Sequence, residues 1–487
     1  MKTEDKTPRS TTDANASSRW ALVGLSLAML LSSLGTSIAN VSLPTLAQVF
    51  AASFQDVQWV VLAYLLTITA LIVGAGKLGD IVGRRRLLLA GILLFTSASV
   101  LCGIAPALWV LIVARAFQGL GAAVMMALTM AFVGEIVPKS KMGSAMGLLG
   151  TMSAIGTALG PSLGGVLIAG PSWRAIFLIN VPLGVVTACF VHVYLPRDRR
   201  NTQKGRAKFD HMGTALLSLS LAAYALAMTL GRGKFGSLNA LLLLAALGGF
   251  VAFVFVETHA TAPLVRFAMF RDRVLSASLM MSTLVSTVMM ATLVVGPFYL
   301  SRGFGMDAAL VGVAMSVGPI AAALTGVPAG RIADHFGAQR TTVVGLIGIG
   351  AGTFALSIIP MAFGIAGYIA PIVVVTTGYA LFQTANNTAV MSEVHAEQRG
   401  VISGLLNLSR NLGLITGASV MGAVFAFASA ANDISTAPPA SVATGMQATF
   451  LVATILIVVA ITAARYGNSL RTSARRKSAH TTMTMSS

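Results

Sequence analysis

The chain has 487 residues, of which 56% are hydrophobic and only 10% are charged, and its mean hydropathy is +0.83. This composition excludes the water-soluble protein classes and predicts a polytopic membrane protein. The formal net charge of +18 would favour a nucleic-acid partner only if the basic residues gathered in one region. They are spread over many loops, so we expect no nucleic acid to bind.

Apolar runs long enough to cross a bilayer recur along the chain and predict an all-α membrane protein with fourteen transmembrane helices. The runs cover residues 20–42, 57–76, 87–105, 108–132, 143–168, 174–195, 212–230, 238–256, 275–300, 308–329, 341–360, 366–391, 401–428 and 447–465. Residues 1–19 are polar, and we expect them to form a disordered cytoplasmic tail. The first run is too long for the apolar core of a signal peptide, so we expect no cleavage.

Lysines and arginines alternate between successive connections. Basic clusters such as 84–86 and 139–141 follow even-numbered helices, whereas the opposite connections hold few basic residues: Arg174, Arg232, Lys234 and Arg302. Cytoplasmic loops are enriched in Lys and Arg. We therefore expect a multi-pass protein of the cytoplasmic (inner) membrane, embedded in the lipid bilayer with both termini in the cytoplasm.

The connection between the second and third helices, from Gly76 to Arg86, combines glycines with an acid inside a basic cluster. Its glycines, Gly76 and Gly83 among them, allow close turns. Asp80 can accept hydrogen bonds from Arg84 or from the end of a facing helix. We predict a gating loop that breaks and reforms as parts of the protein move. The alternative is a basic loop that only sets the topology.

Polar side chains inside four predicted helices fall at helical spacing, which places them on single faces. They are Thr36, Ser37 and Asn40 on the first helix, Arg115 and Gln118 on the fourth, Gln383, Asn386 and Asn387 on the twelfth, and Asn407, Arg410 and Asn411 on the thirteenth. A charge deep in a membrane is costly and usually functional, so we predict a shared aqueous substrate cavity. The alternative is that these groups only bond one another between helices, at about 0.6 to 2 kcal/mol for each pair.

The fifth helix has a stripe of glycines, mostly four residues apart, and one proline. The stripe includes Gly143, Gly147, Gly156, Gly160 and Gly164, with Pro161 among them. Small side chains let another backbone approach closely, and proline bends a helix. Simple packing accounts for the stripe, and the functional alternative is a flexible seam between two halves of the molecule.

Two such halves are indicated by an internal repeat. The segment from Gly76 to Arg86 returns in degenerate form from Gly330 to Arg340, and glycines of the fifth helix return on the thirteenth. We expect an N-terminal six-helix bundle at 20–196 and a C-terminal six-helix bundle at 274–466. Between them, 197–273 forms a cytoplasmic linker with two inserted helices, and 467–487 forms a cytoplasmic tail.

No motif for a cofactor is visible. The segment from Gly74 to Lys77 lacks the first glycine of a phosphate-binding loop and its following Ser or Thr, and the histidines do not cluster. We therefore expect no enzyme, no metal and no cofactor. The energy source is then an ion gradient or the gradient of the substrate itself.

Over nearly its whole length the chain resembles the major facilitator superfamily, and within it the fourteen-helix drug:proton antiporters. The resemblance rests on four segments: Gly76 to Arg86, Leu111 to Gly119, Gly156 to Gly165 and Ile38 to Pro44. The Gly-Pro pattern in the third of these is associated with exporters. The resemblance implies a monomeric transporter that moves small molecules outward in exchange for protons.

In one respect the sequence departs from that family, which typically has an Asp on the first helix where this chain has Gly35. The carboxylates that remain near the cytoplasmic mouth are Asp80 and Glu135, and they are the candidates for proton coupling. Two transport hypotheses follow. One is proton-dependent export of amphipathic or drug-like compounds. The other is exchange or uniport of organic anions or metabolites, with Arg115 and Arg410 as anion ligands and without proton coupling. A membrane-embedded enzyme or receptor is a third, weaker hypothesis.

Overall fold

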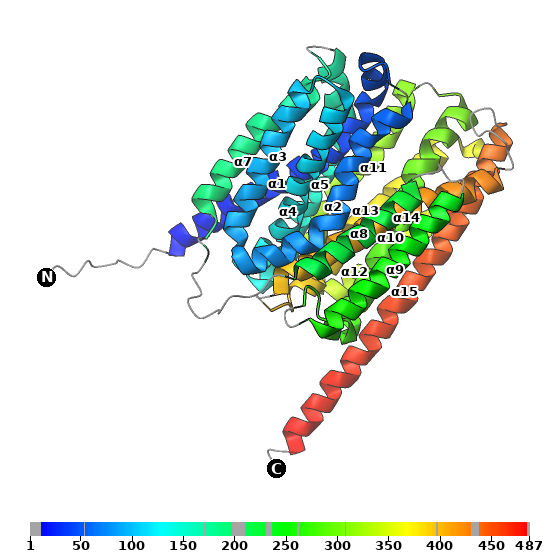
Figure 1. The fold of residues 1–487 in the computed structure, drawn as a ribbon. Coiled ribbons are helices and arrows are strands. Elements are labelled where there is room, and N and C mark those ends of the chain that lie inside the picture. Colours follow the sequence, from blue (N-terminus) through cyan, green and yellow to red (C-terminus); the bar gives the residue numbers. More distant parts are fainter. Residues whose placement is uncertain are drawn as a thin grey trace.

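The computed structural model describes residues 11–52, 54–169, 172–196, 198, 210–229, 236–260, 263–306, 308–395, 398–429 and 438–484. Within these residues it is helical and contains 14 helices long and apolar enough to cross a membrane, which confirms the predicted fold class (Figure 1). One of these spans is made of two short pieces, α6 (Ala175–Leu178) and α7 (Asn180–Tyr194), separated at Ile179.

The N-terminal bundle consists of α1 (Thr11–Val49), α2 (Phe54–Val82), α3 (Arg84–Ile104), α4 (Leu108–Ile136), η1 (Lys139–Lys141), α5 (Met142–Ala169), α6 and α7. The inserted pair is α8 (His211–Thr229) and α9 (Ser237–His259), followed by η2 (Phe267–Arg271). The C-terminal bundle consists of α10 (Arg273–Phe298), η3 (Tyr299–Gly303), α11 (Ala308–Phe336), α12 (Ala338–Ile358), η4 (Met361–Phe363), α13 (Gly364–Met391), α14 (Arg399–Ala428) and α15 (Pro439–Thr484).

Two terminal helices extend beyond the apolar runs. α1 begins at Thr11, so the expected disordered tail at 1–19 is corrected: its last part is helical, and residues 1–10 lie outside the described residues. Residues 12–23 contain neither Gly nor Pro, so nothing in the sequence stops the helix from starting early. At the other end of the chain, α15 runs to Thr484 and projects from the bundle (Figure 1).

The two bundles repeat one packing pattern. α1 packs on α5 as α10 packs on α14, and α3 packs on α4 as α12 packs on α13. At one end of the molecule, α2 turns into α3 at Gly83 and α11 turns into α12 at Gly337, with φ of 116° and 88°. Only glycine adopts such positive φ values without strain, which explains why the repeat keeps a glycine there. We call this end, which also holds Lys139–Lys141, the basic end.

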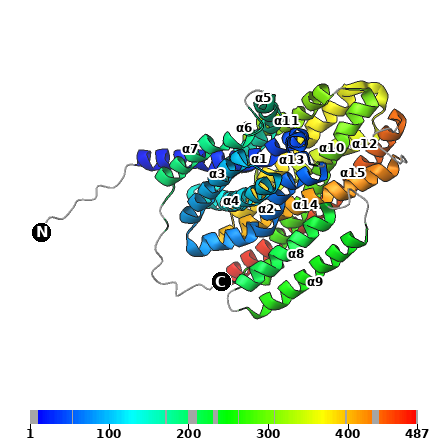
Figure 2. The same ribbon diagram turned by 45° about the horizontal axis from the view of Figure 1, so that its top comes forward.

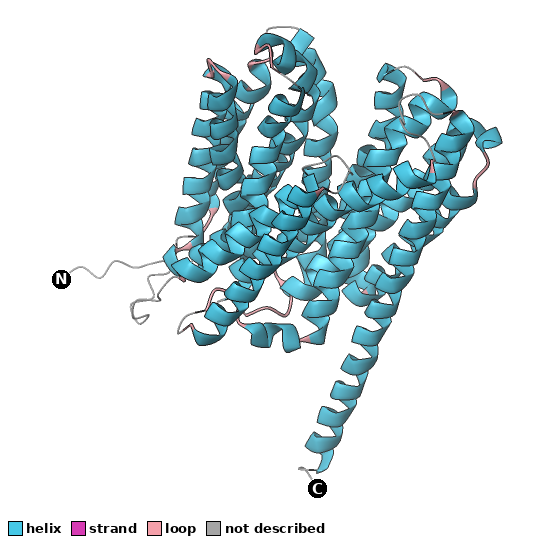
Figure 3. Ribbon diagram, turned by 45° about the vertical axis from the view of Figure 1, so that its right-hand side comes forward, coloured by secondary structure: helices cyan, strands magenta, loops and turns pink. Residues whose placement is uncertain are grey.

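The bundles meet at the basic end and diverge toward the other end (Figure 3). The contact between them, called the seam below, pairs α5 with α11 and α2 with α14. A buried apolar cluster near this end joins residues of α1 to α5 with Met391 of α13 and with Val401 to Leu408 of α14. Two further clusters are confined to the C-terminal bundle and to the N-terminal bundle. The apolar core therefore crosses the seam in the part near the basic end.

Candidate substrate cavity and gate

The gating loop reaches the opposite bundle. Asp80, near the end of α2, accepts hydrogen bonds from the first backbone amides of α14: Gly400 N donates to Oδ1 at 3.2 Å, and Val401 N donates to Oδ2 at 3.3 Å. Free amides and the helix dipole make a helix N-terminus favourable for a carboxylate. A Cβ on Gly76 would lie 2.1 Å from the carbonyl oxygen of Gly400, so glycine is needed for this approach. We call this contact the Asp80 latch.

Arg84 joins the Asp80 latch to a second acid. Its Nε and Nη2 donate to Asp80 Oδ1 at 3.0 and 2.8 Å, and its Nη1 donates to Glu135 Oε2 of α4 at 2.9 Å. The side chains of Asp80 and Arg84 are 6% and 10% exposed, whereas that of Glu135 is 42% exposed. Asp80 thus accepts hydrogen bonds from Arg84 and from the facing helix, the two donors that the sequence suggested.

The repeat builds a second contact of the same kind. Asp334 of α11 accepts hydrogen bonds from the backbone N of Gly143 and of Ser144 at 2.7 and 2.8 Å, and from Ser144 Oγ at 2.6 Å. These donors lie in the first turn of α5, the counterpart of α14. We call this contact the Asp334 latch. Asp334 is a site residue that the polar patterns of the sequence do not single out, although its match to Asp80 in the repeat marks its position.

The glycines of α5 divide between two opposite faces. Cβ atoms on Gly143 and Gly147 would lie 2.6 and 2.3 Å from carbonyl oxygens of Gly330 and Gly326 on α11. By contrast, Gly156 and Gly160 face α1 of their own bundle. A Cβ on Gly156 would lie 2.6 Å from Leu30 O, and a Cβ on Gly160 would lie 2.1 Å from Ser37 Oγ. The predicted stripe of Gly156, Gly160, Pro161 and Gly164 is therefore corrected: its described contacts lie within one bundle, and the glycines between the halves are Gly143 and Gly147.

The physical reason is helical geometry. Gly147 and Gly156 are nine residues apart, which is two and a half turns at about 3.6 residues per turn and so reverses the face. The same division occurs on α14, where Gly400 and Gly404 face α2, while Gly413 and Gly417 face α10 of the same bundle. Gly164 is buried, and the side chain of Pro161 lies outside the described residues. α5 and α14 each pack closely on both bundles.

Arg115 does not line a shared cavity in this structure. It is 0% exposed, its Nε donates to Val60 O at 2.8 Å, and its Nη1 donates to Gln118 Oε1 at 2.6 Å. The guanidinium also lies 4.1 Å from the centroid of the Tyr64 ring, and Gln118 Nε2 donates to Ser99 Oγ at 2.7 Å. The prediction for Arg115 and Gln118 is corrected: a backbone carbonyl, an amide and a ring face hold the charge inside the N-terminal bundle.

The polar face of α14 lies along the seam. Ser403 Oγ donates to Ala127 O at 2.5 Å, and Asn407 Nδ2 approaches Met126 O at 3.5 Å, both on α4. Arg410 and Asn411 follow on the same face, one turn farther from the basic end, and both are partly exposed. Arg410 Nε has no hydrogen-bond partner among the described residues. This arginine therefore has bonding capacity to spare at the point where the bundles begin to diverge.

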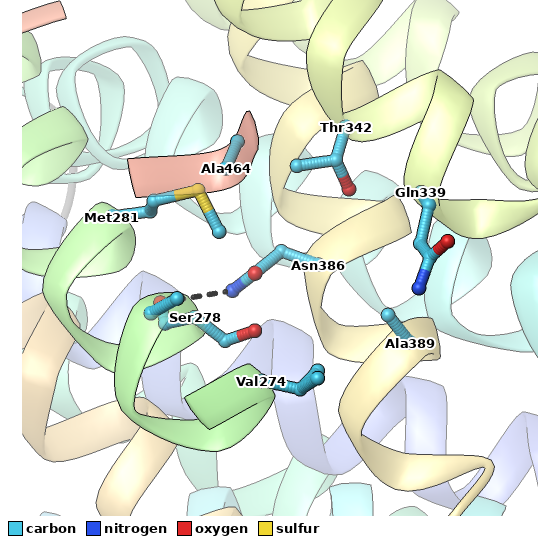
Figure 4. A pocket seen from close by; sticks show the side chains of 9 residues that line it. Val274, Ser278, Met281, Gln339, Thr342, Asn386, Ala389 and Ala464 are labelled. Carbon is cyan, nitrogen blue, oxygen red and sulfur yellow. Dashed lines mark hydrogen bonds between the residues drawn. The ribbon is translucent and has the colours of Figure 1, made fainter. Parts of the chain in front are cut away.

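On α13 the predicted polar residues separate. Gln383 and Asn387 are partly exposed, and Thr384 Oγ1 between them lies 3.8 Å from a Cβ position on Gly150 of α5, so this part of α13 faces the N-terminal bundle. Asn386 turns the other way and donates to Ser278 O of α10 at 3.3 Å. It borders a small pocket inside the C-terminal bundle with Gln339 (Figure 4), so its assignment to the shared cavity is corrected.

On α1, the hydroxyls of the predicted stripe bond to backbone carbonyls. Thr36 Oγ1 donates to Ser32 O at 3.1 Å, and Ser37 Oγ donates to Thr157 O of α5 at 2.7 Å. The side chain of Asn40 lies outside the described residues. Of the predicted cavity residues, the partly exposed ones are Thr36, Ser37, Gln383, Asn387, Arg410 and Asn411.

Comparisons with known proteins agree with this arrangement. A family described as Major Facilitator Superfamily matches residues 25–418. The riboflavin transporter RibZ of Clostridioides difficile is 28% identical over 84% of this chain and 88% of its own. The multidrug resistance protein Stp of Mycobacterium tuberculosis is 29% identical over 83% of this chain and 75% of its own. The tetracenomycin C resistance and export protein of Streptomyces glaucescens is also 29% identical, over 83% of this chain and 75% of its own.

Solved structures share the fold. The proton:xylose symporter XylE has a TM-score of 0.66 at 14% identity, with 92% of this chain and 95% of that chain covered. The human organic anion transporter TETRAN has a TM-score of 0.64 at 14% identity, with coverages of 92% and 99%.

Proposed function

The chain belongs to the Major Facilitator Superfamily, and from this premise we propose that it exports amphipathic or drug-like small molecules across the cytoplasmic membrane in exchange for protons by alternating access. The observation that carries the proposal is the pair of latches at one end of two repeated bundles. Each latch joins a carboxylate of one bundle to a helix start of the other. Such contacts break when the bundles rock apart and reform when they close.

The energies suit a reversible gate. A hydrogen bond to a charged group contributes about 1.5–3 kcal/mol, so the latches and the packed glycines hold the basic end closed without making opening prohibitive. We place the basic end in the cytoplasm, because its connections hold most of the lysines and arginines. The structure then corresponds to a state closed toward the cytoplasm.

A labelling experiment tests this orientation. In a chain without native cysteines, an impermeant thiol reagent applied to intact cells should modify a cysteine at position 440 and spare one at position 82. Val82 is 51% exposed at the basic end, and Ala440 is exposed at the start of α15. The opposite labelling pattern would overturn the orientation.

For substrates, the arginine on α14 favours some charges over others. Arg410 is partly exposed, and no Asp or Glu occurs within the inner turns of α13 or α14. Two unit charges about 4 Å apart interact by about 1 to 4 kcal/mol at effective dielectric constants between water and the protein surface. We therefore expect neutral, zwitterionic or anionic amphiphiles to be transported better than permanent lipophilic cations. The names of the relatives, which include multidrug, riboflavin and tetracenomycin C transport, are compatible with such a range.

Proton coupling is assigned to Asp80 and Glu135, both bonded to Arg84. Protonation of either acid would weaken its attraction to the guanidinium and loosen the Asp80 latch. The family typically has an Asp at the position of Gly35. In this chain Gly35 faces the hydroxyl of Tyr64, and the Arg115 guanidinium lies over the ring of Tyr64. An aspartate at this position would stand close to the buried charge.

Counter-flow in proteoliposomes, with and without a pH gradient, tests the proposed exchange. Proton-coupled export requires accumulation of an amphiphile to follow the imposed pH gradient. A transport rate that does not change with the pH gradient, but rises when organic anions are present on the opposite side of the membrane, would favour the second function, exchange or uniport of organic anions. The free Nε of Arg410 supports that alternative, whereas the burial of Arg115 removes it as a direct anion ligand in this state.

Charge selectivity is tested with ethidium in whole cells. The wild type is expected to extrude this cation weakly. Arg410→Gln, at matched expression, is expected to extrude it faster, because the variant removes the partly exposed positive charge on α14. Strong extrusion by the wild type with no gain in the variant would contradict the charge argument.

A further inference from the structure

The inserted helix α8 bonds to both bundles. Near the basic end, Ser218 Oγ donates to Ala70 O of α2 at 3.0 Å. Farther along, the hydroxyls of Tyr224 and Thr416 of α14 share a hydrogen bond, and Ser419 Oγ donates to Met228 O. Figure 2 shows α8 beside α2 and α14, with α9 on its outer side. A change at the base of this pair of helices therefore acts on an element that spans the seam.

Two carboxyl groups meet at that base. Asp210 immediately precedes α8, and its Oδ1 accepts a hydrogen bond from Gly213 N in the first turn at 2.7 Å. Glu257, near the end of α9, is 3% exposed, and its Oε1 accepts from Val265 N at 2.6 Å. A Cβ on Gly213 would lie 2.4 Å from Asp210 Oδ2 and 2.6 Å from Glu257 Oε2. The two oxygens are thus no farther apart than the sum of these distances.

Such a pair needs a proton. Neither Asp210 Oδ2 nor Glu257 Oε2 receives a hydrogen bond from another described residue. An ionised carboxylate only accepts hydrogen bonds, so these two unpartnered oxygens can bond to each other only when one carboxyl group is protonated and donates. Two ionised carboxylates at this separation repel each other, and one proton bound to either carboxylate removes that repulsion. The geometry therefore favours one proton on the pair.

Other titratable residues lie on the elements that carry or adjoin the pair. His211 follows Asp210 on α8, and His259 follows Glu257 by two residues on α9, where its ring nitrogen meets Phe255 O at 2.8 Å. Arg266 next to Val265 is exposed, and Lys77 lies near the basic end of α2. In the part of the chain that the structure describes, neither carboxyl of the pair forms a salt bridge.

We propose that Asp210 and Glu257 form a proton-binding site at the base of the inserted pair of helices, and that release of this proton weakens the attachment of α8 to α9 beside the seam. The site adds to the proposed function without depending on it, because it binds its proton whether or not substrate is present. It also gives the two inserted helices a role that a simple spacer would not have.

The test uses the purified full-length protein in detergent, without substrate. Its thermal unfolding is followed between about pH 6 and about pH 8. In this range the folded pair holds a proton that ordinary carboxyl groups of the unfolded chain, with pKa of about 3.9 to 4.3, have lost. The folded state then binds more protons, so stability falls as the pH rises, by up to about tenfold in the folding equilibrium constant for each pH unit.

The neutral variants Asp210→Asn and Glu257→Gln are expected to lack this component of the pH dependence. Glu393→Gln, which neutralises an exposed acid between α13 and α14, should retain it. Infrared difference spectra provide a measurement that does not depend on stability: the wild type should show the carbonyl band of a protonated carboxylic acid, and either neutral variant should lose it. Parallel pH profiles for wild type and Glu257→Gln, an unchanged infrared band, or stabilisation of the pair by sodium or calcium instead of protons would overturn the proposal.

Discussion

The Asp80 and Asp334 latches come from the same repeat, and each joins a carboxylate of one bundle to a helix start of the other, but their hydrogen-bond donors differ. Asp334 makes three short hydrogen bonds to the first turn of α5, including one from the Ser144 hydroxyl. Asp80 makes two longer bonds to α14 and adds the ion pair with Arg84, which continues to Glu135. At the position equivalent to Arg84, the second half has Ala338.

This difference separates a latch whose donors are all uncharged from one that also has a charged donor. The Asp334 latch relies on backbone amides and a hydroxyl, which do not titrate near neutral pH. The Asp80 latch includes an arginine shared between two acids, so protonation of an acid changes the charge balance. If protons drive the gate, they should act through the half that retained the basic cluster, while the other half supplies a fixed mechanical contact.

The largest effect is expected from removing the close approach that both latches need. In Gly76→Val and Gly330→Val, the new Cβ would lie 2.1 and 2.3 Å from the facing carbonyl oxygens of Gly400 and Gly143. Overpacking costs about 1–3 kcal/mol, or about fivefold to more than a hundredfold in the population of the closed seam. Transport by both variants should nearly cease. Gly312→Val, on α11 with open space around its Cβ, is the control and should remain active.

A smaller but unequal effect is expected from neutralising the two aspartates. Asp80→Asn should insert and accumulate nearly normally but lose most transport, because Arg84 loses its buried anionic partner and charged hydrogen bonds contribute about 1.5–3 kcal/mol. Asp334→Asn should lose less, although its bonds are shorter, because no buried cation is left unpaired. Transport assays at matched membrane abundance measure both. A fully active Asp80→Asn, or a loss of abundance in parallel with activity, would return the loop to a purely structural role.

Removal of the Ser144 hydroxyl tests the Asp334 latch in isolation. Ser144→Ala deletes one of its three bonds and keeps both backbone donors, so the expected loss is about 0.5–1.5 kcal/mol. The measurement is the reactivity of a cysteine that replaces Thr151, a buried residue of α5 whose hydroxyl donates to Ala323 O across the seam, toward a membrane-permeant thiol reagent. We expect a severalfold faster reaction in Ser144→Ala. An unchanged rate would show that the hydroxyl does not help to hold the seam.

The smallest effect is expected from Glu135→Gln. The side chain of Glu135 is 42% exposed, and exposed ion pairs contribute about 0–1 kcal/mol. At fixed pH, transport should fall by less than about fivefold, and its dependence on pH should flatten if Glu135 carries the coupling proton. A variant with an unchanged pH profile would leave Asp80 as the coupling candidate in this latch.

Local sequence patterns were sufficient for the helices, the repeat and the donors to Asp80, because hydrophobic length and the spacing of Gly and Asp record them directly. The burial of Arg115 was not predictable in this way. Its partners, Val60 O and the Tyr64 ring, are both on α2, so they depend on how α2 packs against α4. Asp210 and Glu257 were missed for a related reason: each sits at a helix end, where acids are ordinary, and only the antiparallel pairing of α8 with α9 brings them together.

The apolar cluster that crosses the seam also bears on how the protein is made. The N-terminal bundle leaves the ribosome first, yet the part of its core near the basic end includes Met391 and Val401 to Leu408, which are synthesised almost last. The C-terminal bundle has a core of its own residues alone. During biogenesis the N-terminal bundle therefore lacks part of its apolar core until α13 and α14 are made. A nascent chain truncated before α14 would expose the apolar side chains that α14 covers to lipid or to chaperones.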